Sequence, residues 1–404
     1  MEEVLEEMRV LLVHRYYFPD SPPYASILKD MRGMLALQSE YVDILASQPS
    51  YKSTDRSKVV AWKIKDDLGI VHRLPTLKSN NQKINKVFNF FWFPFLSFWV
   101  VLFGKKYKVV TVSTAPPVLL AFSIALACKI RRMKLVYHCM DIHPEIGQIS
   151  GEFNKEWVFN FLIKLDKFTC RVASRIIVLS GDMEQSLLQR DDTLQNKIEI
   201  INNYNLGGGQ LVKQNFFDQN DGKFRIVFAG NIGRFQNLDI LVTALSWANS
   251  KANMQLVFVG EGAALDQLKN LVQELKLEGF VQFIPHQPIG IAKKIIKDSQ
   301  IAVVSIQEKI IHYAYPSKTM TYLSLGIPIL ALVEGGSELA KTIINHNLGF
   351  VCSPKDIESL SNVISNLNNE MQSIDKSNIQ KYFRDTFSKD KFQSKLLNTI
   401  ESIL

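Results

Sequence analysis

FRIVFAGNIGRFQNLDILVTAL, residues 224–245, runs from an apolar, β-rich stretch through a glycine turn into a stretch with helical spacing. Gly230 and Gly233 lie in the turn, and Leu238 and Leu241 begin the apolar face of the helix. A strand that leads through a turn into a helix is the repeating unit of a parallel sheet with crossover helices. Backbone N–H groups and the positive end of a helix meet at such a turn, so we expect an anion there. The glycines do not match the dinucleotide pattern Gly-x-Gly-x-x-Gly, and the sequence has no Walker-type Gly-Lys-Ser/Thr.

The same alternation of strand and helix runs along nearly the whole chain. In the first half the apolar, β-rich runs are 9–15, 41–47, 69–75, 108–114, 134–140, 175–180 and 197–202. In the second half they are 224–229, 254–260, 281–285, 301–306, 327–333 and 349–353. A break rich in Asn, Gln and Gly separates the halves at 203–222. We therefore predict an α/β fold with two doubly wound Rossmann-like domains that face a central cleft.

The expected domain limits follow from this break. We place the N-terminal domain at 1–205 and the C-terminal domain at 206–385. Residues 386–404 are expected to form a helix that packs back towards the N-terminal domain. Because ligands of parallel sheets bind beyond the carboxyl ends of the strands, the loops that follow the strands are the candidate site.

The composition fits a reduced globular protein with an anionic partner. The 404 residues are 47% apolar, and 47 Lys and Arg against 39 Asp and Glu give a net charge of +8. Such an excess favours a partner that carries phosphate, such as a nucleotide, an anionic membrane or nucleic acid. The acidic N-terminus MEEVLEEM lacks the pattern of a secretory signal, so we expect the protein to face the cytoplasm. The scattered cysteines argue against a metal or disulfide framework; they are Cys128, Cys139, Cys170 and Cys352.

Positive charge is concentrated in a window without any acidic residue, Leu68–Met140. Within it, residues 87–103 (VFNFFWFPFLSFWVVLF) form an uncharged run rich in Phe and Trp, with lysines on both sides. As a helix this run would be about 25 Å long, short of the hydrocarbon core of a bilayer, and Pro94 lies in its middle. We expect peripheral contact with an anionic membrane surface; a buried helix and a spanning helix are the alternatives. Nucleic acid is not expected as a partner, because the lysines lie outside the aromatic block.

Two loops of the first half carry polar groups at strand ends. The loop YYFPDSPPYAS, 16–26, is stiff and rich in proline, and it forms either one wall of an acceptor pocket or a rigid surface turn. The loop HCMDIHPE contains Asp141 and His143, which are suited to hydrogen-bonding a polyhydroxylated substrate or to adjusting a proton near the reacting oxygen. The alternative for Asp141 is that it caps the following helix. The His and acidic residues of this loop match no standard zinc spacing, so we expect no metal.

The segment YPSKTMTYLSLGIPILA, 315–331, places a lysine where a helix begins. Pro316 and Ser317 start the helix, so Lys318 lies in its first turn, where the helix dipole disfavours a cation. An anionic ligand would account for a lysine at this position. Arg234 adds a multidentate donor beside the first glycine turn.

Together these segments resemble the nucleotide-sugar-dependent glycosyltransferases of the GT-B architecture, in particular retaining family 4 in its branch that builds bacterial surface polysaccharides. The resemblance covers essentially the whole chain and is most specific in YPSKTMTYLSLGIPILA, with DIHPE and VFVGEG preceding it in order. It implies retaining, metal-independent transfer of a hexose from a UDP- or GDP-sugar, without a cofactor. The implied acceptor is a lipid-linked saccharide at the inner face of the cytoplasmic membrane.

The resemblance also implies roles for individual residues. Lys318 and Arg234, with the turn amides of Gly230 to Gly233, would neutralise the departing diphosphate. His143 and Asp141 would approach the transferred sugar or the acceptor hydroxyl. The implied donor-binding residues are Gly230, Asn231, Gly233, Gly260, Glu261, Pro285, His286, Glu308, Pro316, Ser317 and Thr321, and the implied acceptor-binding residues are Ser21, Pro22 and Tyr24.

The sequence departs from the family pattern at the donor site. Asn231 and Gln236 stand where the family usually has Arg and Lys. Tyr313 and Thr321 stand where it has a pair of glutamates, and Glu308 is the candidate substitute for the glutamate that grips the ribose. Two alternatives to a transferase therefore stay open: a non-catalytic scaffold that binds sugar nucleotide at the membrane, and a nucleotide-sugar epimerase.

Overall fold

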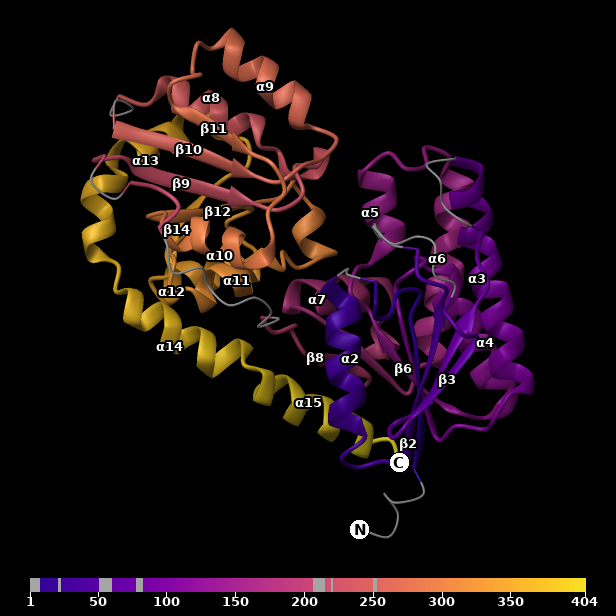
Figure 1. Ribbon diagram of the computed structural model, residues 1–404. Helices are drawn as coiled ribbons and strands as arrows, with labels where there is room; N and C mark the ends of the chain where they lie inside the picture. The colour runs from indigo at the N-terminus through magenta and orange to yellow at the C-terminus, as the bar shows by residue number, and fades with distance from the viewer. Residues whose placement is uncertain are drawn as a thin grey trace. The chain divides into compact units, whose positions relative to one another are not determined.

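The computed structural model describes residues 8–20, 23–50, 60–77, 83–205, 215–218, 221–249 and 253–404. Ser21 and Pro22, two of the predicted acceptor residues, lie outside this set. The described chain forms two compact units, each with one sheet surrounded by helices (Figure 1). The first unit extends to Asn202 and takes in Phe392–Leu404, and the second is Asn203–Lys391. The prediction of an α/β chain with two Rossmann-like domains is confirmed.

The first unit is built on an eight-stranded sheet with the order β3-β4-β2-β1-β5-β6-β7-β8. Its strands are β1 (Arg9–Val13), β2 (Tyr41–Ser47), β3 (Lys63–Asp66), β4 (Gly69–Leu74), β5 (Val109–Ser113), β6 (Lys134–His138), β7 (Arg175–Val178) and β8 (Ile198–Ile200). All pairs are parallel except β3 with β4. The chain winds outwards from β1 in one direction and resumes at β5 in the other, so the switch point of the sheet lies between β1 and β5.

Helices pack around this sheet and bury its central strands. They are α2 (Pro23–Leu35), α3 (Lys83–Phe103), α4 (Leu119–Arg131), α5 (His143–Ile149), α6 (Glu156–Val172), α7 (Gly181–Arg190) and the 3-10 turn η1 (Asp192–Leu194). Every residue of β5 is buried, which explains why parallel strands are readable as continuous apolar runs. The 87–103 run is helical, within α3, and one side of that helix packs against α4. Among the described residues, no helix combines the length and apolarity needed to cross a bilayer.

Strand β3 was not predicted from the sequence. All four of its residues are exposed, so the segment contains no apolar run to mark it. It folds back antiparallel on β4, and Arg32 of α2 donates to both carboxylate oxygens of Asp66 at 2.6 and 2.7 Å. This bidentate ion pair links the edge strand β3 to α2.

The second unit is built on a six-stranded parallel sheet with the order β11-β10-β9-β12-β13-β14. Its strands are β9 (Phe224–Ala229), β10 (Met254–Val259), β11 (Val281–Ile284), β12 (Ile301–Ser305), β13 (Ile329–Leu332) and β14 (Gly349–Cys352). Its helices are α8 (Asp239–Trp247), α9 (Leu265–Glu274), α10 (Ile289–Lys297), α11 (Lys318–Ser324), α12 (Glu338–Asn345), α13 (Ile357–Glu370) and α14 (Lys376–Phe387), with 3-10 turns η2 (Arg234–Gln236), η4 (Ile310–His312) and η5 (Met371–Ser373). By the same logic its switch point lies between β9 and β12.

The final helix, α15 (Lys389–Glu401), begins in the second unit and continues into the first. Phe392, Leu396 and Ile400 are buried on one side of it, at helical spacing. Lys395 donates from Nζ to the carbonyl oxygen of Ile200 at 3.1 Å, which ties the helix to the end of β8.

Candidate active site

Lys318 lies at the carboxyl edge of the second sheet, beside the end of β9. It is the first residue of α11, and its Nζ is 4.3 Å from the centre of the Phe228 ring. Its side chain passes over Gly230, where an added Cβ would lie 2.6 Å from the lysine Cε. Burial lowers the pKa of Lys318 to about 8, and no carboxylate in the described part of the chain offsets that effect. A half-buried cation without a carboxylate partner is ready to bind an anion.

Gly230 and Gly260 allow two strand ends to meet closely under that lysine. Their φ angles are +136° and +135°, which side chains rarely tolerate. A Cβ on Gly260 would lie 2.1 Å from the carbonyl oxygen of Gly230. The two glycine turns predicted from the sequence therefore pack directly against each other, and the first of them lies against the Lys318 side chain.

Three backbone amides of the first turn, which we expected to form part of an anion cradle, already have acceptors within the protein. The N–H of Gly230 donates to the Val259 carbonyl at 2.8 Å, and that of Ile232 donates to the Glu261 carbonyl at 2.9 Å. The N–H of Gly233 donates to Gln236 Oε1 at 2.9 Å. The expectation that these three amides face a ligand is thus wrong, because each already has an acceptor within the protein. The positive helix end is also displaced, since α8 begins only at Asp239.

The other predicted donor residues follow β9, β10, β11 and β12, so they gather along the same carboxyl edge. Those with exposed side chains are Asn231, Arg234, Glu261, Pro285, His286 and Ser317, and those that are half-buried are Pro316, Thr321 and Glu308. Glu308 forms an ion pair with Lys355, and the hydrogen bond from Lys355 lowers the pKa of the Glu308 carboxyl. Lys355 could not be predicted here, because it lies 47 positions beyond Glu308 in the chain.

The DIHPE segment leads from β6 into the short helix α5. His143 is the first residue of α5, and its Nε2 lies 3.0 Å from Glu152 Oε2. Asp141 is exposed, and no side chain caps the start of α5. The alternative of Asp141 as a helix cap is therefore wrong, because Ile142 occupies the cap position of α5.

Glu145 of the same helix belongs to a buried charge network that the sequence did not reveal. Arg190 of α7 contacts Glu145 through Nε at 3.5 Å and Asp166 of α6 through Nη1 at 2.8 Å. The hydroxyl of Tyr137 on β6 also donates to Asp166 at 3.1 Å. Burial raises the pKa of Glu145, although Arg190 opposes this. The network joins α5, α6, α7 and β6, and so fixes the helix that carries His143.

A polar cluster occupies the switch point of the first sheet. His14 follows β1 and hydrogen-bonds through Nδ1 to Ser113 Oγ at the end of β5. The hydroxyl of Tyr24, on α2, lies 2.9 Å from Nδ1 of His138 at the end of β6. Burial lowers the pKa of His14 to about 3 and that of His138 to about 4, so both rings are neutral at neutral pH. Tyr24, a predicted acceptor residue, is thus held at the switch point where ligands of such sheets bind.

A buried arginine forms hydrogen bonds to the backbone of the YYFPDSPPYAS loop. Arg73 of β4 is 2% exposed and donates to the carbonyl oxygens of Ser47, Tyr17 and Phe18. Its guanidinium carbon lies 5.4 Å from the centre of the Tyr17 ring. The acid-free window therefore includes a structural arginine, as well as solvated lysines.

A family assignment follows from comparison with known proteins. Residues 212–384 match the family model described as Glycosyl transferases group 1. The second unit is a group 1 glycosyl transferase domain. The resemblance to glycosyltransferases that the sequence motifs indicated is thereby confirmed.

Relatives and solved structures extend the match beyond the glycosyl transferase domain. The "Probable glycosyltransferase WbjE" of Pseudomonas aeruginosa is 24% identical over 300 residues, which are 70% of this chain and 73% of that protein. The "Putative colanic acid biosynthesis glycosyl transferase WcaI" of Escherichia coli K12 is 21% identical over 372 residues, 87% and 90% of the two chains. The crystal structure of Anabaena HepE in complex with UDP and glucose has a TM-score of 0.68 at 15% identity and covers 98% of this chain and 100% of that one. This likeness confirms the GT-B fold.

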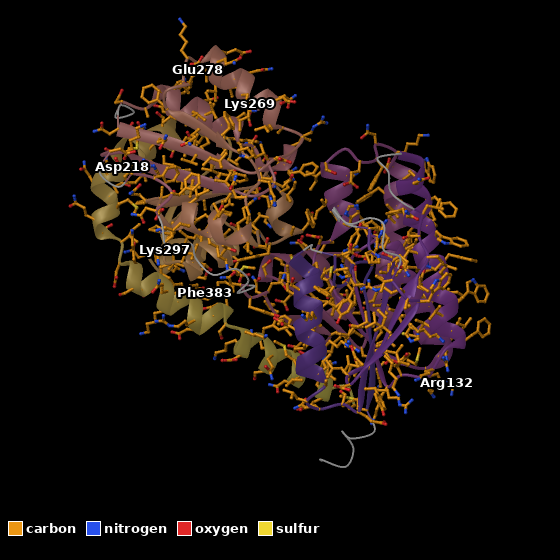
Figure 2. All side chains as sticks on the ribbon, in the orientation of Figure 1. Arg132, Asp218, Lys269, Glu278, Lys297 and Phe383 are labelled. Carbon is orange, nitrogen blue, oxygen red and sulfur yellow. The ribbon has the colours of Figure 1, made fainter. Side chains whose placement is uncertain are left out.

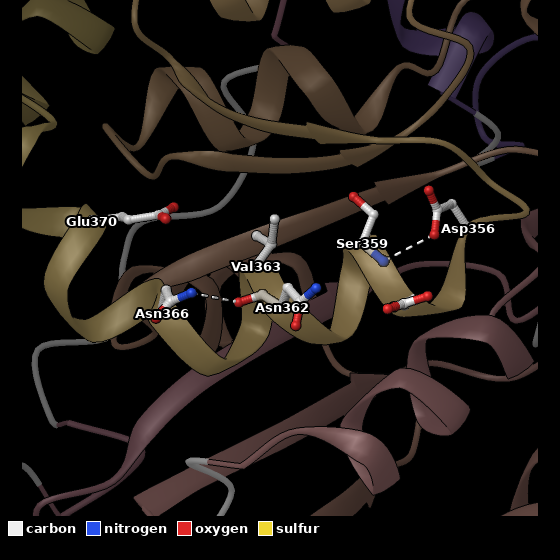
Figure 3. Close-up of a pocket in the computed structure, with 7 residues that line it drawn as sticks. Asp356, Ser359, Asn362, Val363, Asn366 and Glu370 are labelled. Atoms are coloured by element: carbon white, nitrogen blue, oxygen red, sulfur yellow. Dashed lines mark hydrogen bonds between the residues drawn. The ribbon is translucent and has the colours of Figure 1, made fainter.

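The surface depression in Figure 3 lies along α13 of the glycosyl transferase domain, and no predicted site residue is among those that line it. Its volume is about 390 Å³, and it is lined by Asp356, Glu358, Ser359, Asn362, Val363, Asn366 and Glu370. Asp356 caps α13 by accepting from the Ser359 N–H at 2.9 Å, so one of its acids already has a structural role. Among the described residues, no group of three His, Cys, Asp or Glu side chains is arranged to hold a metal ion.

Proposed function

We propose that the protein is a retaining, metal-independent hexosyltransferase. It moves a sugar from a UDP- or GDP-sugar to a lipid-linked saccharide in cell-surface polysaccharide synthesis, at the inner face of the cytoplasmic membrane. The observation that carries the proposal is Lys318, a half-buried cation without a carboxylate partner at the carboxyl edge of a glycosyl transferase domain. The name of WcaI, a putative colanic acid biosynthesis enzyme, supports the polysaccharide part.

Departure of the diphosphate is the step that requires fixed positive charge. As the bond from the sugar to the nucleotide breaks, negative charge builds on the leaving phosphate oxygen. Lys318 gains an anionic partner there, which offsets the burial that lowers its pKa. The exposed guanidinium of Arg234 supplies a second, multidentate donor. The complex of HepE with UDP and glucose supports a sugar nucleotide as the donor.

The transfer itself is proposed to use no protein nucleophile. The oxygen of the leaving diphosphate takes the proton of the acceptor hydroxyl while the new glycosidic bond forms on the same face of the sugar, which retains its configuration. His143 and Asp141 bind hydroxyls of the reacting sugars, and Tyr24 contacts the acceptor. Glu308, with Lys355 beside it, takes the place of the missing ribose-binding glutamate.

Membrane contact is proposed through the exposed side of α3. Six apolar residues there have between 41% and 76% of their surface exposed: Val87, Phe88, Phe91, Phe95, Trp99 and Phe103. The rings of Trp99 and Phe103 stack with centres 5.5 Å apart. The opposite side of α3 is buried, with Phe93 and Val101 fully covered, so the aromatic stripe is not needed for the core. A contiguous apolar surface of this kind marks an interaction site, and Phe and Trp suit the headgroup boundary of a bilayer.

Exposed cations adjoin this stripe. Lys105, Lys106 and Lys108 follow the end of α3, and Arg132 follows the end of α4 at the periphery of the first unit (Figure 2). Each basic side chain near an anionic leaflet contributes roughly 1 kcal/mol of attraction. Aromatic insertion and charge attraction together favour a protein that lies on the membrane, where a lipid-linked acceptor is within reach.

The test of transfer is a labelling assay. Protein incubated with radiolabelled UDP- and GDP-sugars and a bacterial membrane lipid extract should label the lipid fraction. Lys318→Met should reduce the rate on the order of 100-fold, as removal of one charge-stabilising group does. Lys341→Met removes an exposed lysine of α12 and should leave the rate unchanged. Full activity in Lys318→Met would remove that lysine from the mechanism; inversion at the anomeric carbon, or loss of activity in EDTA, would overturn the corresponding part of the proposal.

The test of membrane contact is sedimentation with liposomes. The protein should pellet with vesicles that contain phosphatidylglycerol and be released by high salt. The double variant Phe91→Ser and Phe95→Ser should stay in the supernatant, because two exposed rings of α3 are lost. Trp247→Ser is the matched control, since Trp247 is 57% exposed on α8 of the other unit. Binding that is indifferent to lipid charge and to the α3 variant would contradict a membrane role.

Thr321 and Tyr313, in place of two glutamates, favour one competing function, a non-catalytic scaffold. Such a protein would bind a UDP- or GDP-sugar in calorimetry yet transfer no label with any member of the donor panel. An epimerase would instead alter the donor sugar in the absence of any acceptor. The labelling assay, run with and without lipid extract, separates these three outcomes.

A further inference from the structure

Glu152 is placed against the imidazole of His143 by the turn that follows α5. Its Oε2 lies 3.0 Å from His143 Nε2. The histidine side chain is 19% exposed and the glutamate side chain 51% exposed. The pair therefore lies at the surface of the first unit, with one edge of the ring covered by protein.

The turn is fastened to α5 by backbone contacts, so the position of Glu152 does not depend on its side chain alone. The N–H of Glu152 donates to the carbonyl oxygen of Gly147 at 2.9 Å, and the N–H of Gly151 donates to that of Gln148 at 3.2 Å. Phe153 packs on Gly147 so closely that an added Cβ would lie 2.4 Å from its ring. A glycine at 147 is what allows the turn to lie against the helix.

The chemistry of the pair fixes where the imidazole proton lies. The hydrogen bond from His143 lowers the pKa of the Glu152 carboxyl, so this group is a carboxylate at neutral pH and can only accept. Nε2 must then carry the proton of the neutral ring, and Nδ1 is left with a lone pair. The other acid of the helix, Glu145, is engaged by Arg190 at 3.5 Å.

We propose that Glu152 is a positioning residue, which holds His143 in the Nε2–H tautomer so that Nδ1 accepts a hydrogen bond from a hydroxyl of the reacting sugars. This inference rests on the proposed function for the identity of the hydroxyl, but the tautomer is a property of the free protein. Glu152 itself touches neither substrate. Glu152 disfavours the other tautomer, in which Nδ1 carries the proton and cannot accept a hydrogen bond from a sugar hydroxyl.

The direct test is ¹⁵N NMR of protein labelled at histidine, with the His143 signals assigned by their loss in His143→Gln. At pH 8 the wild type should show Nε2 protonated and Nδ1 unprotonated. Glu152→Ala should give a mixture of tautomers, whereas Glu152→Gln should keep the wild-type pattern, because its amide oxygen still accepts from Nε2–H. The matched control is Glu156→Ala, an exposed acid in the first turn of α6.

Kinetics supply the second readout. Glu152→Ala should lower kcat about tenfold with less than about a twofold change in the donor KM, and Glu152→Gln should recover most of the loss. A wild-type ring protonated at Nδ1, an unaltered tautomer in Glu152→Ala, or an equal loss in Glu156→Ala would each overturn the assignment. If no donor and acceptor pair gives transfer, the proposed function fails, and the NMR result still decides the role of Glu152. If Glu152→Ala proves unstable, Glu152→Leu with an intact circular dichroism spectrum replaces it.

Discussion

Replacing Lys318 by methionine is expected to make the protein more stable and, at the same time, to lower its transfer rate on the order of 100-fold. The reason is that burial lowers the pKa of this lysine from 10.5 to about 8 without a carboxylate to compensate. The folded protein at pH 7 therefore holds a charge that its surroundings disfavour. Methionine has a similar length, packs over Gly230 in the same way, and carries no charge.

The magnitude can be worked out from two opposing contributions. A pKa depression from 10.5 to about 8 corresponds to about 3 kcal/mol of destabilisation of the charged folded form. The contact of the ammonium with the Phe228 ring at 4.3 Å is lost in the variant and offsets about 1 kcal/mol. The net gain at pH 7 should be about 2 kcal/mol.

The same shift fixes the sign of the pH dependence. The folded pKa lies below the unfolded one, so the unfolded chain binds more protons between about pH 8 and pH 10.5. The free energy of unfolding contributed by Lys318 therefore rises with pH across that window. The advantage of Lys318→Met over the wild type should shrink accordingly as the pH increases.

The assay is urea unfolding followed by circular dichroism at pH 7 and pH 10, together with the labelling assay. Lys341→Met is the control for removing a lysine as such, and it should alter neither stability nor transfer. A Lys318→Met protein that is less stable than the wild type at pH 7, or whose advantage is the same at both pH values, would refute the reasoning. A gain in stability at the expense of activity is the pattern expected when a charge is kept for function.

Three further predictions concern the framework of the site. Gly260→Ala should destabilise the glycosyl transferase domain by about 2 to 5 kcal/mol in urea unfolding, because φ at this position is +135° and an added Cβ would lie 2.1 Å from the carbonyl oxygen of Gly230. Gly279→Ala is the control and should be close to neutral, because nothing lies within 4 Å of a Cβ added there; equal effects of the two variants would contradict the packing argument. Arg190→Met should lower the free energy of unfolding of the first unit by about 3 to 5 kcal/mol, because it leaves Asp166 buried without its cation. The double variant Arg190→Met and Asp166→Asn should recover most of that loss, and no recovery would argue against a charge effect. Acid should destabilise the first unit as the pH falls from 6.5 towards 4, because His14 and His138 have folded pKa values of about 3 and about 4, so the unfolded chain binds more protons than the folded one. In His138→Gln the loss of unfolding free energy between neutral pH and pH 4 should be smaller by about 3 kcal/mol, and an unchanged pH profile would count against the burial of that ring.

The buried parallel strands were predictable, and the exposed edge strand was not. Residues 224–229 form an apolar run that only Arg225 interrupts, because β9 lies inside its sheet with neighbours on both sides. Lys63–Asp66 has no buried residue, and its place in the sheet depends on Arg32, more than thirty positions earlier in the chain. Pairing partners at such separation leave no mark in local sequence.

The candidate site shows the same division. The position of Lys318 at the start of a helix is a local pattern, and it could be predicted from Pro316 and Ser317. Whether the amides of Gly230 and Ile232 are free depends on the carbonyls of Val259 and Glu261 across the sheet, which no local pattern reports. Glu152 was missed for a different reason: it lies nine residues beyond His143, at a distance that matches no helical spacing, and only the turn after α5 brings the two together.

The return of α15 to the first unit has a consequence for how the chain is made. Because Phe392–Leu404 belongs to the first unit, the glycosyl transferase domain is inserted in the sequence of its partner. During synthesis the strands of the first unit are complete once β8 has been made. The surface of that unit against which Phe392, Leu396 and Ile400 pack stays exposed until the whole inserted domain has been synthesised. The nascent protein therefore passes through a stage in which this apolar surface is exposed, and chaperones that bind such surfaces should act on the chain until α15 has emerged and packed against the first unit.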